Sequence, residues 1–145
     1  MKITVASDHA ALELKSAVIT HLKQKGMQVE DAGPHNTTPT DYPDFAQKVC
    51  AQVAGKKADL GILICGTGIG MSMAANKIKG IRCALCADTF SARMTRLHND
   101  ANVLAIGART VGEGLALDIV DAFVDTKFSG DARHAARIEK IMALE

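Results

Sequence analysis

Short apolar runs alternate along this chain with longer segments in which apolar residues recur at helical spacing. The short runs predict five buried strands, at 2–7, 27–32, 60–65, 81–87 and 102–107. The segments between them predict helices at about 10–25, 43–54, 70–77, 89–97 and 111–124. Strands that alternate with helices in this way are typical of a parallel sheet with helices on both faces.

The third predicted strand has the most informative ending. Its apolar run, Leu60–Cys65, stops at a cysteine and passes at once into a Gly-x-Gly-x-Gly loop, Gly66–Gly70. Cys65 is therefore expected at the carboxyl end of a parallel strand, where open α/β sheets bind their ligands. The loop amides and the start of the next helix add positive potential that favours a thiolate. The pattern indicates a reactive base or nucleophile at Cys65.

A last helix is predicted at about 131–144, after Gly130 interrupts the preceding pattern. Arg133 and Arg137 are four residues apart, so a helix places both guanidinium groups on one face. An apolar stripe elsewhere on this helix contains Ala135, Ile138, Ile141 and Met142. The helix could therefore pack on a partner subunit and present two cations to an anion, although the arginines alone also fit a solvated basic face.

Composition restricts the classes of partner. With 145 residues, 48% of them hydrophobic and 23% charged, the chain fits one globular domain over 1–145. A net charge of +1 argues against nucleic acid or a membrane surface as the main partner. No apolar stretch approaches the roughly 18 residues of a membrane span, and the amino terminus enters a strand pattern instead of a signal peptide. The sequence predicts a cytoplasmic protein.

The four cysteines are expected to be free thiols, because a cytoplasmic chain with a large core keeps its cysteines reduced. Cys83 and Cys86 form a C-x-x-C pair within a predicted strand. Their odd separation points them to opposite faces, which argues against a shared zinc ion. Cys50 lies in a helical pattern and is predicted to fill the core.

Further polar residues follow the ends of predicted elements. Asp8 and His9 follow the first strand, and Arg109 follows the fifth. His98 and Asn99 are expected in the loop before the fifth strand. Taken singly, Asp8 could be a helix cap and each histidine could be structural. Together with the cysteine and the glycine loop, they predict an active site built from loops at the sheet.

Two phosphate-binding motifs can be compared with the glycine loop. The P-loop is absent, since no Gly-Lys-Ser/Thr follows. The dinucleotide fingerprint would need glycine at Met71, although Asp88 lies where a ribose-binding acid would be expected. A Gly-x-Gly-x-Gly loop is nevertheless well suited to hold an oxyanion through successive backbone amides.

Several segments closely resemble ribose-5-phosphate isomerase of type B, a family related to galactose-6-phosphate isomerase subunits. They are SDHAALELK, TDYPDFA, ILICGTGIGMSMAANK, RLHNDANVLAIGART and DARHAAR. The resemblance covers essentially the whole chain. It implies a three-layer α/β/α sandwich with a Rossmann-like five-stranded parallel sheet, and no metal or other cofactor. It also implies homodimers or homotetramers whose active sites combine residues from two subunits.

The resemblance also implies roles for individual residues. Cys65 is similar to the base that moves a proton between the two carbons adjoining the carbonyl; some relatives use a glutamate further along the loop, but Gly70 and Met71 stand there in this chain. His98 matches the residue that opens the furanose ring, and Asp8 assists with hydroxyl protons. The residues that match the enediolate-holding group are Thr67, Gly66, Gly68 and Gly70. Tyr42 and Asn99 match sugar contacts, and the matches to phosphate contacts are His9, Arg109, Arg133 and Arg137.

The implied function is interconversion of D-ribose 5-phosphate and D-ribulose 5-phosphate through an enediolate, in the non-oxidative pentose phosphate pathway. The first alternative is isomerisation of a six-carbon sugar phosphate, such as allose 6-phosphate or galactose 6-phosphate. The second is a non-catalytic nucleotide-binding module. Such a module needs the glycine loop, but it leaves Cys65, His98 and the terminal arginines unexplained.

Overall fold

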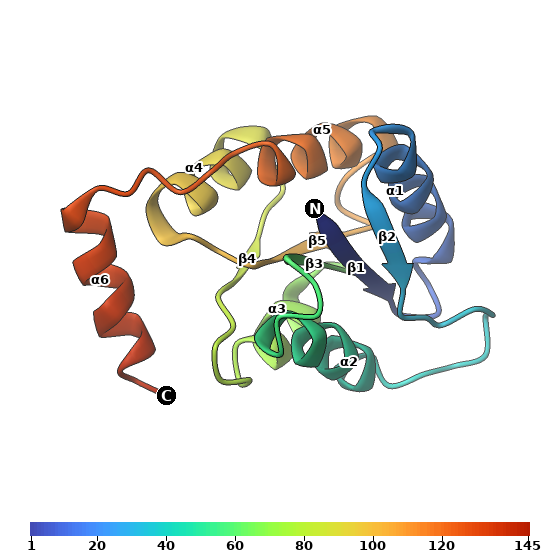
Figure 1. Cartoon of the computed structure of the whole chain (residues 1–145). Coiled ribbons are helices and arrows are strands. Elements are labelled where there is room, and N and C mark those ends of the chain that lie inside the picture. Colours follow the sequence, from blue (N-terminus) through green and yellow to red (C-terminus); the bar gives the residue numbers. More distant parts are fainter.

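The computed structural model describes residues 1–145 and contains a five-stranded parallel sheet between two layers of helices (Figure 1). The strands are β1 (Lys2–Ser7), β2 (Gln28–Asp31), β3 (Leu60–Cys65), β4 (Cys83–Leu85) and β5 (Val103–Gly107). The helices are α1 (Leu12–Gln24), α2 (Tyr42–Ala54), α3 (Ile69–Ala75), α4 (Thr89–Asn99), α5 (Glu113–Val124) and α6 (Ala132–Met142). The strand order is β2-β1-β3-β5-β4, and every neighbouring pair is parallel. The predicted α/β/α sandwich with an additional C-terminal helix is confirmed.

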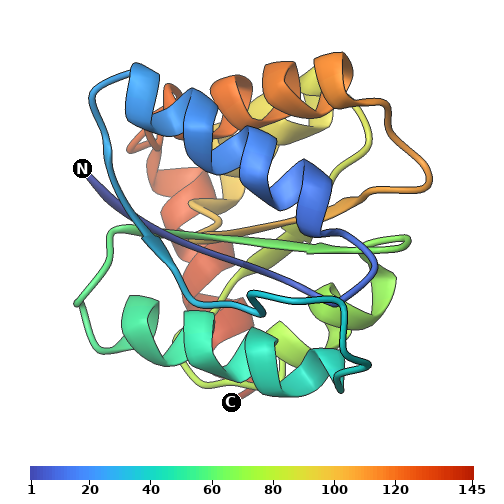
Figure 2. The ribbon, with the colours of Figure 1, turned by 90° about the vertical axis from the view of Figure 1, so that its right-hand side faces the viewer.

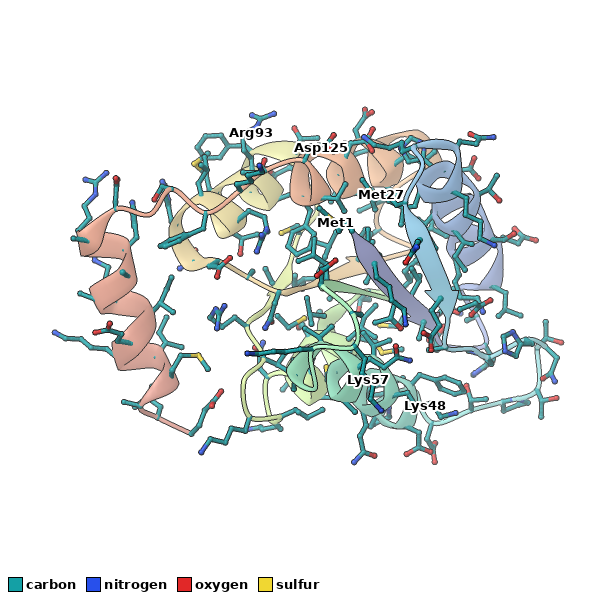
Figure 3. The ribbon with its side chains drawn as sticks, in the orientation of Figure 1. Met1, Met27, Lys48, Lys57, Arg93 and Asp125 are labelled. Carbon is teal, nitrogen blue, oxygen red and sulfur yellow. The ribbon has the colours of Figure 1, made fainter.

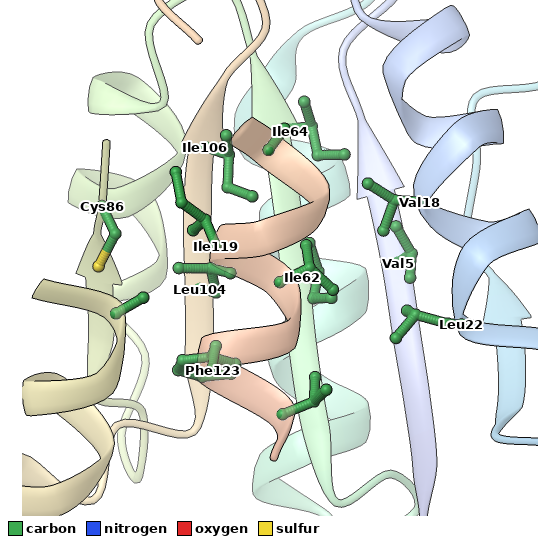
Figure 4. Packing of buried hydrophobic residues seen from close by; sticks show 14 of the residues in the cluster. Val5, Val18, Leu22, Ile62, Ile64, Cys86, Leu104, Ile106, Ile119 and Phe123 are labelled. Atoms are coloured by element: carbon green, nitrogen blue, oxygen red, sulfur yellow. The ribbon is translucent and has the colours of Figure 1, made fainter. Parts of the chain in front are cut away.

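The two faces of the sheet carry separate hydrophobic cores. Helices α1, α4 and α5 cover one face, and α2 and α3 cover the other (Figure 2). In β3, Ile62 and Ile64 belong to the first core, whereas Leu63 and Cys65 belong to the second. Figure 4 shows the first core, in which Ile62 lies close to α5. Because both faces of the central strands are buried, these strands have continuous apolar sequences, which made them recognisable in the sequence.

The amino ends of β1 and β2 lie on the side of the sheet opposite the predicted active site, which follows the carboxyl ends of the strands. Met1 and Met27, labelled in Figure 3, stand just before these two strands, and the amide of Gln28 donates to the carbonyl of Met1 at 3.2 Å.

Helix α1 ends where it was predicted to end, since Gly26 adopts a φ of +79°, a conformation that glycine tolerates best. None of the helices has the length and apolar content that a membrane span requires.

Helix α1 carries a lysine on its buried face. The side chain of Lys15 is 5% exposed, and its ammonium group donates to Asp31 Oδ1 at 2.7 Å and to the carbonyl of Pro34 at 2.5 Å. Asp31 Oδ1 also accepts a hydrogen bond from the amide of Gly33 at 2.8 Å. Lys15 therefore fixes the start of the irregular segment 32–41, which leads from β2 to the first residue of α2.

Replacing Lys15 with methionine is expected to lower the free energy of unfolding by about 1–3 kcal/mol, because the change leaves the Pro34 carbonyl without its donor and removes the cation paired with the Asp31 carboxylate. Urea denaturation of the purified variant would measure the change. Lys2→Met is the matched control, since Lys2 pairs with Glu30 at 3.0 Å through side chains that are 40% and 41% exposed. Its effect should stay below about 1 kcal/mol. Equal effects of the two substitutions would contradict a special role of the buried lysine.

Helix α4 is longer than predicted. It ends at Asn99 because Asp100 adopts a left-handed conformation with a φ of +44°, and the amide of Asp100 donates to the carbonyl of Arg96 at 3.2 Å. The prediction that His98 and Asn99 lie in a loop is therefore wrong. Both residues occupy the last turn of α4, so a helix fixes where they stand.

Strand β4 is shorter than predicted and forms one edge of the sheet. Ile81 and Arg82 are excluded from it, because the amide of Ile81 donates to a turn carbonyl and that of Arg82 donates to Asn102 Oδ1 at 2.8 Å. On the outer side of β4, Asn76 Nδ2 donates to the carbonyl of Cys83 at 2.9 Å, and Asn76 Oδ1 accepts from the amide of Cys83 at 2.9 Å. The Asn76 side chain thus pairs with the edge strand as a neighbouring backbone would.

The cysteines outside the glycine loop occupy the expected environments, and all four cysteines are free thiols. Cys83 packs against the core beneath α2 and α3, whereas Cys86 belongs to the opposite core. The odd spacing therefore does direct them to opposite faces. Cys50 is fully buried in α2, which confirms its predicted place in the core.

Candidate active site

The carboxyl ends of β1, β3 and β5 lie side by side. The chain leaves β1 towards β2 and leaves β3 in the other direction, so β1 and β3 flank a topological switch point of the kind that binds ligands. The amide of Asp8 donates to the carbonyl of Ile64 at 2.9 Å, and the amide of Ala108 donates to the carbonyl of Cys65 at 2.8 Å. The residues that follow these three strands therefore meet, as predicted.

The glycine loop folds over the Cys65 side chain. The amide of Gly68 donates to Cys65 Sγ at 3.1 Å, and Gly68 has a φ of +77°, which turns the chain into α3. The Thr67 hydroxyl accepts a hydrogen bond from the amide of Ile69 at 3.3 Å. Cys65 is 6% exposed, so its sulfur atom is held at the base of the loop by backbone groups.

Close packing around the loop requires small residues at two positions. A Cβ atom on Gly107 would lie 2.6 Å from the backbone of Thr67, so only glycine lets β5 pass beneath the loop. A Cβ atom on Gly70 would lie 2.7 Å from the ring of Tyr42. The Tyr42 side chain therefore rests against the far end of the loop, although it lies distant in the sequence.

The remaining polar residues of this edge come from loops after β1 and β5. Arg109 lies beside Gly66, since its amide donates to the Gly66 carbonyl at 2.9 Å and its side chain passes along the loop. His9 Nδ1 accepts a hydrogen bond from the amide of Thr40 at 3.2 Å, which leaves Nε2 as the donor of a neutral ring. Asp8 Oδ1 accepts from the amide of Ala10 at 3.0 Å, so it closes the turn before α1 without capping the helix itself. We call the following residues the carboxyl-edge group: Asp8, His9, Tyr42, Cys65, Gly66, Thr67, Gly68, Gly70 and Arg109.

His98 and Asn99 lie at the opposite end of the strands, where β5 begins. Helix α4 returns from the carboxyl end of β4 to the amino end of β5, and His98 is in its last turn. The carbonyl of Asn99 accepts from Arg82 Nε at 3.1 Å, and Arg82 precedes β4. Strand β5 has five residues, a length of about 17 Å that separates the two edges. One chain therefore does not bring His98 and Cys65 together.

The two terminal arginines lie near His98 and not near Cys65. Helix α6 stands apart from the three layers, next to the end of α4 (Figure 1). The ring of His134 on α6 stacks on that of His98 with centroids 4.3 Å apart. Arg133 and Arg137 are exposed on the same short helix, as their spacing predicted. We call the second set the α4–α6 group: His98, Asn99, Arg133 and Arg137.

Several residues that shape these two groups were missed in the sequence. Lys15 occupies a position on the buried, otherwise apolar face of α1. A charged residue at such a position is a sequence signal for a buried ion pair. His134 stands between the two arginines, but its spacing alone does not distinguish it from a surface residue. Gly107 is the last residue of the buried strand β5, and only the packing of Thr67 above it explains why it must be glycine.

Iodoacetamide at about pH 8 is expected to modify Cys65 before the other cysteines. Burial raises the pKa of Cys50 to about 12 and that of Cys86 to about 11, and it raises the pKa of Cys83 as well, so these three remain protonated thiols. Peptide mass spectrometry during a time course would give the order of labelling. Labelling of Cys50 as fast as Cys65 would contradict this expectation.

Comparison with known proteins gives consistent matches over the whole chain. A family model described as Ribose/Galactose Isomerase matches residues 3–141. Ribose-5-phosphate isomerase B of Escherichia coli is 47% identical over 144 residues, which cover 99% of this chain and 96% of that protein. The solved structure of Clostridium thermocellum ribose-5-phosphate isomerase B is 50% identical with a TM-score of 0.97, covering 99% of this chain and 97% of that one. A structure of the Mycoplasma genitalium enzyme with bound ribulose-5-phosphate is 45% identical with a TM-score of 0.94, covering 99% and 95% of the two chains.

Proposed function

This chain belongs to the ribose/galactose isomerase family, and we propose that it interconverts D-ribose 5-phosphate and D-ribulose 5-phosphate by proton transfer through an enediolate. The observation that carries the proposal is the thiol of Cys65 beneath a glycine loop at the switch point of the sheet. The M. genitalium relative binds ribulose-5-phosphate on the same fold, which supports the same substrate class here.

Cys65 is the proposed base. Aldose–ketose isomerisation removes the proton from the carbon next to the carbonyl, leaves negative charge on an enediolate oxygen and returns a proton to the neighbouring carbon. The Cys65 sulfur takes up and returns the carbon-bound proton. The amides of Gly66, Gly68 and Gly70, with the Thr67 hydroxyl, hold the enediolate oxygen as in other oxyanion sites.

The other members of the carboxyl-edge group bind the sugar and move its hydroxyl protons. Asp8 keeps one carboxylate oxygen beyond the one that accepts from Ala10, and that oxygen can exchange a proton with a substrate hydroxyl. Tyr42 borders the loop and contacts the sugar. Arg109 and the Nε2 donor of His9 bind the phosphate, for which the planar guanidinium supplies paired donors.

A second copy of the chain supplies the α4–α6 group. His98, which opens the furanose ring, lies a strand length away from Cys65 in its own chain, as do Asn99 and the terminal arginines. Exposed apolar side chains on α3, β4 and the start of α4 offer a surface for the partner: Ile69, Met73, Leu85 and Phe90. A two-fold dimer buries this surface twice and makes two equal sites, each containing both groups. Pairs of such dimers would give a homotetramer.

The first experiment is a metal-free assay, with a chelator present, of ribose 5-phosphate conversion followed by absorbance of the ketose. Allose 6-phosphate and galactose 6-phosphate are run in parallel. Preferential turnover of the five-carbon sugar supports the proposal. Turnover of a six-carbon sugar alone keeps the chemistry and changes the substrate. Binding of FMN or NAD without any turnover would instead favour the nucleotide-binding alternative.

Light scattering of the same sample should give at least twice the chain mass of 15.3 kDa.

A further inference from the structure

Helix α6 buries one side chain against its own chain, and its end is also joined to the chain by Arg82, which lies 3.5 Å from Met142 Sδ, and by the Gly80 amide, which donates to Glu145 at 2.9 Å. His134 is the only buried residue of the helix, at 6% exposure, whereas Arg133 before it is exposed and Ala135 after it is half-buried. Its ring stacks on the ring of His98 with centroids 4.3 Å apart and an interplanar angle of 13°. The proposed ring-opening residue therefore rests on a second histidine, on the helix that carries the proposed phosphate-binding arginines.

The surroundings of His134 disfavour a positive charge on it. Its Nε2 atom is buried without a hydrogen-bond partner, and the closest carboxylate oxygen, on Asp131, is 3.8 Å away, beyond hydrogen-bonding distance. The charged and titratable groups that face it are His98 on α4 and Arg133, Arg137 and Asp131 around the start of α6. Burial lowers the pKa of His134, and His98 and Arg133 lower it further, while Asp131 opposes the shift.

We propose that His134 is a positioning residue for His98: the buried ring stays neutral, sets the plane of the His98 ring, and leaves His98 as the member of the pair that carries the transferable proton. This inference rests on the proposed function and extends it. Two stacked imidazoles titrate as a coupled pair, in which the first proton disfavours the second. His98 is the more exposed ring and can exchange its proton with a ligand, whereas His134 cannot.

The same contact sets where the arginines stand. Arg133 precedes His134, and Arg137 lies one turn later, so the stack places the part of α6 that carries both arginines next to the His98 ring. A sugar phosphate that spans the site would meet its ring-opening acid and its phosphate-binding cations as one preassembled unit. Loss of the stack should therefore affect both turnover and substrate affinity.

Histidine NMR titration of the whole protein tests the coupling without reference to activity. The five histidines can be assigned with single substitutions. We expect the His134 ring to titrate at lower pH than a free imidazole, and to move to higher pH in His98→Phe, which keeps an aromatic ring but removes the charge. A His134 titration that is ordinary, or that does not respond to His98→Phe, would overturn the proposal.

Kinetics of two His134 variants provide the second test. His134→Ala removes the stack and should lower kcat by about tenfold, a part of the 10²- to 10⁴-fold that positioned acid–base groups supply, and should raise KM. His134→Phe keeps a neutral stacked ring and should retain most activity. Wild-type kinetics in His134→Ala, or equal losses in both variants, would contradict positioning by stacking. If the wild-type chain isomerises no sugar phosphate, the proposed function fails, but the NMR titration still decides whether the histidines are coupled.

Discussion

Cys65→Ala is expected to lower kcat for ribose 5-phosphate isomerisation by 10²- to 10⁴-fold, the range that a positioned general base contributes. The substitution removes the sulfur that accepts the carbon-bound proton but leaves the glycine loop and Arg109 in place. KM should therefore change much less than kcat. Cys65→Ser should be nearly as inactive, because a hydroxyl is a far weaker acid than a thiol and is rarely ionised at neutral pH. Steady-state rates measured by ketose absorbance would check both variants.

Cys50→Ala is the matched control for this experiment. Cys50 is also a buried cysteine, but it lies in α2 outside the candidate active site, and burial raises its pKa to about 12, so it cannot act as a base at neutral pH. Its replacement should leave turnover of the folded enzyme close to that of the wild type. Activity that survives in Cys65→Ala would exclude Cys65 as the base and would redirect the search to Asp8.

Mixing two inactive variants, Cys65→Ala and His98→Asn, is expected to restore roughly a quarter of the wild-type activity after subunit exchange. Half of the dimers then contain one chain of each kind. In each such dimer, one site receives both substitutions, and the other receives an intact Cys65 from one chain and an intact His98 from its partner. The two homodimers contribute almost nothing. Activity measured against mixing ratio should pass through a maximum at equal amounts.

A mixture of Cys65→Ala with Asp8→Ala is the control. Both residues belong to the carboxyl-edge group of one chain, so every site in the mixed dimer keeps one of the two lesions. This pair should show no recovery under the same exchange conditions. Absence of recovery in the test mixture, although the subunits exchange, would mean that a single chain supplies Cys65 and His98 together, in conflict with the separation seen in the fold.

Most of the carboxyl-edge group could be placed from the sequence because its positions depend on strand ends; the exception is Tyr42, which begins α2. The buried strands have continuous apolar sequences, and each ends where a polar residue or glycine follows, as at Asp8, Cys65 and Arg109. Parallel strands align such ends at one edge regardless of their order. The sequence therefore predicted that these residues lie close together without knowledge of the sheet topology.

The α4–α6 group could not be placed in the same way. The position of His98 relative to Cys65 depends on the direction of α4 and on β5 lying between β3 and β4, which are long-range properties of the fold. The end of α4 was also predicted two residues early, because the left-handed conformation of Asp100 is not evident from the residues before it. The stack of His134 on His98 joins two helices across a long connection and leaves no periodic signal.

The side chain of Asn76 also limits how this protein can aggregate. An open strand edge invites further strands and can start the growth of an extended intermolecular sheet. On β4 the outward amide and carbonyl of Cys83 are already bonded to Asn76, so an incoming strand would have to displace both bonds first. Association at this edge is then shifted towards side-chain contacts, which favours a closed assembly of few copies over an open-ended fibre.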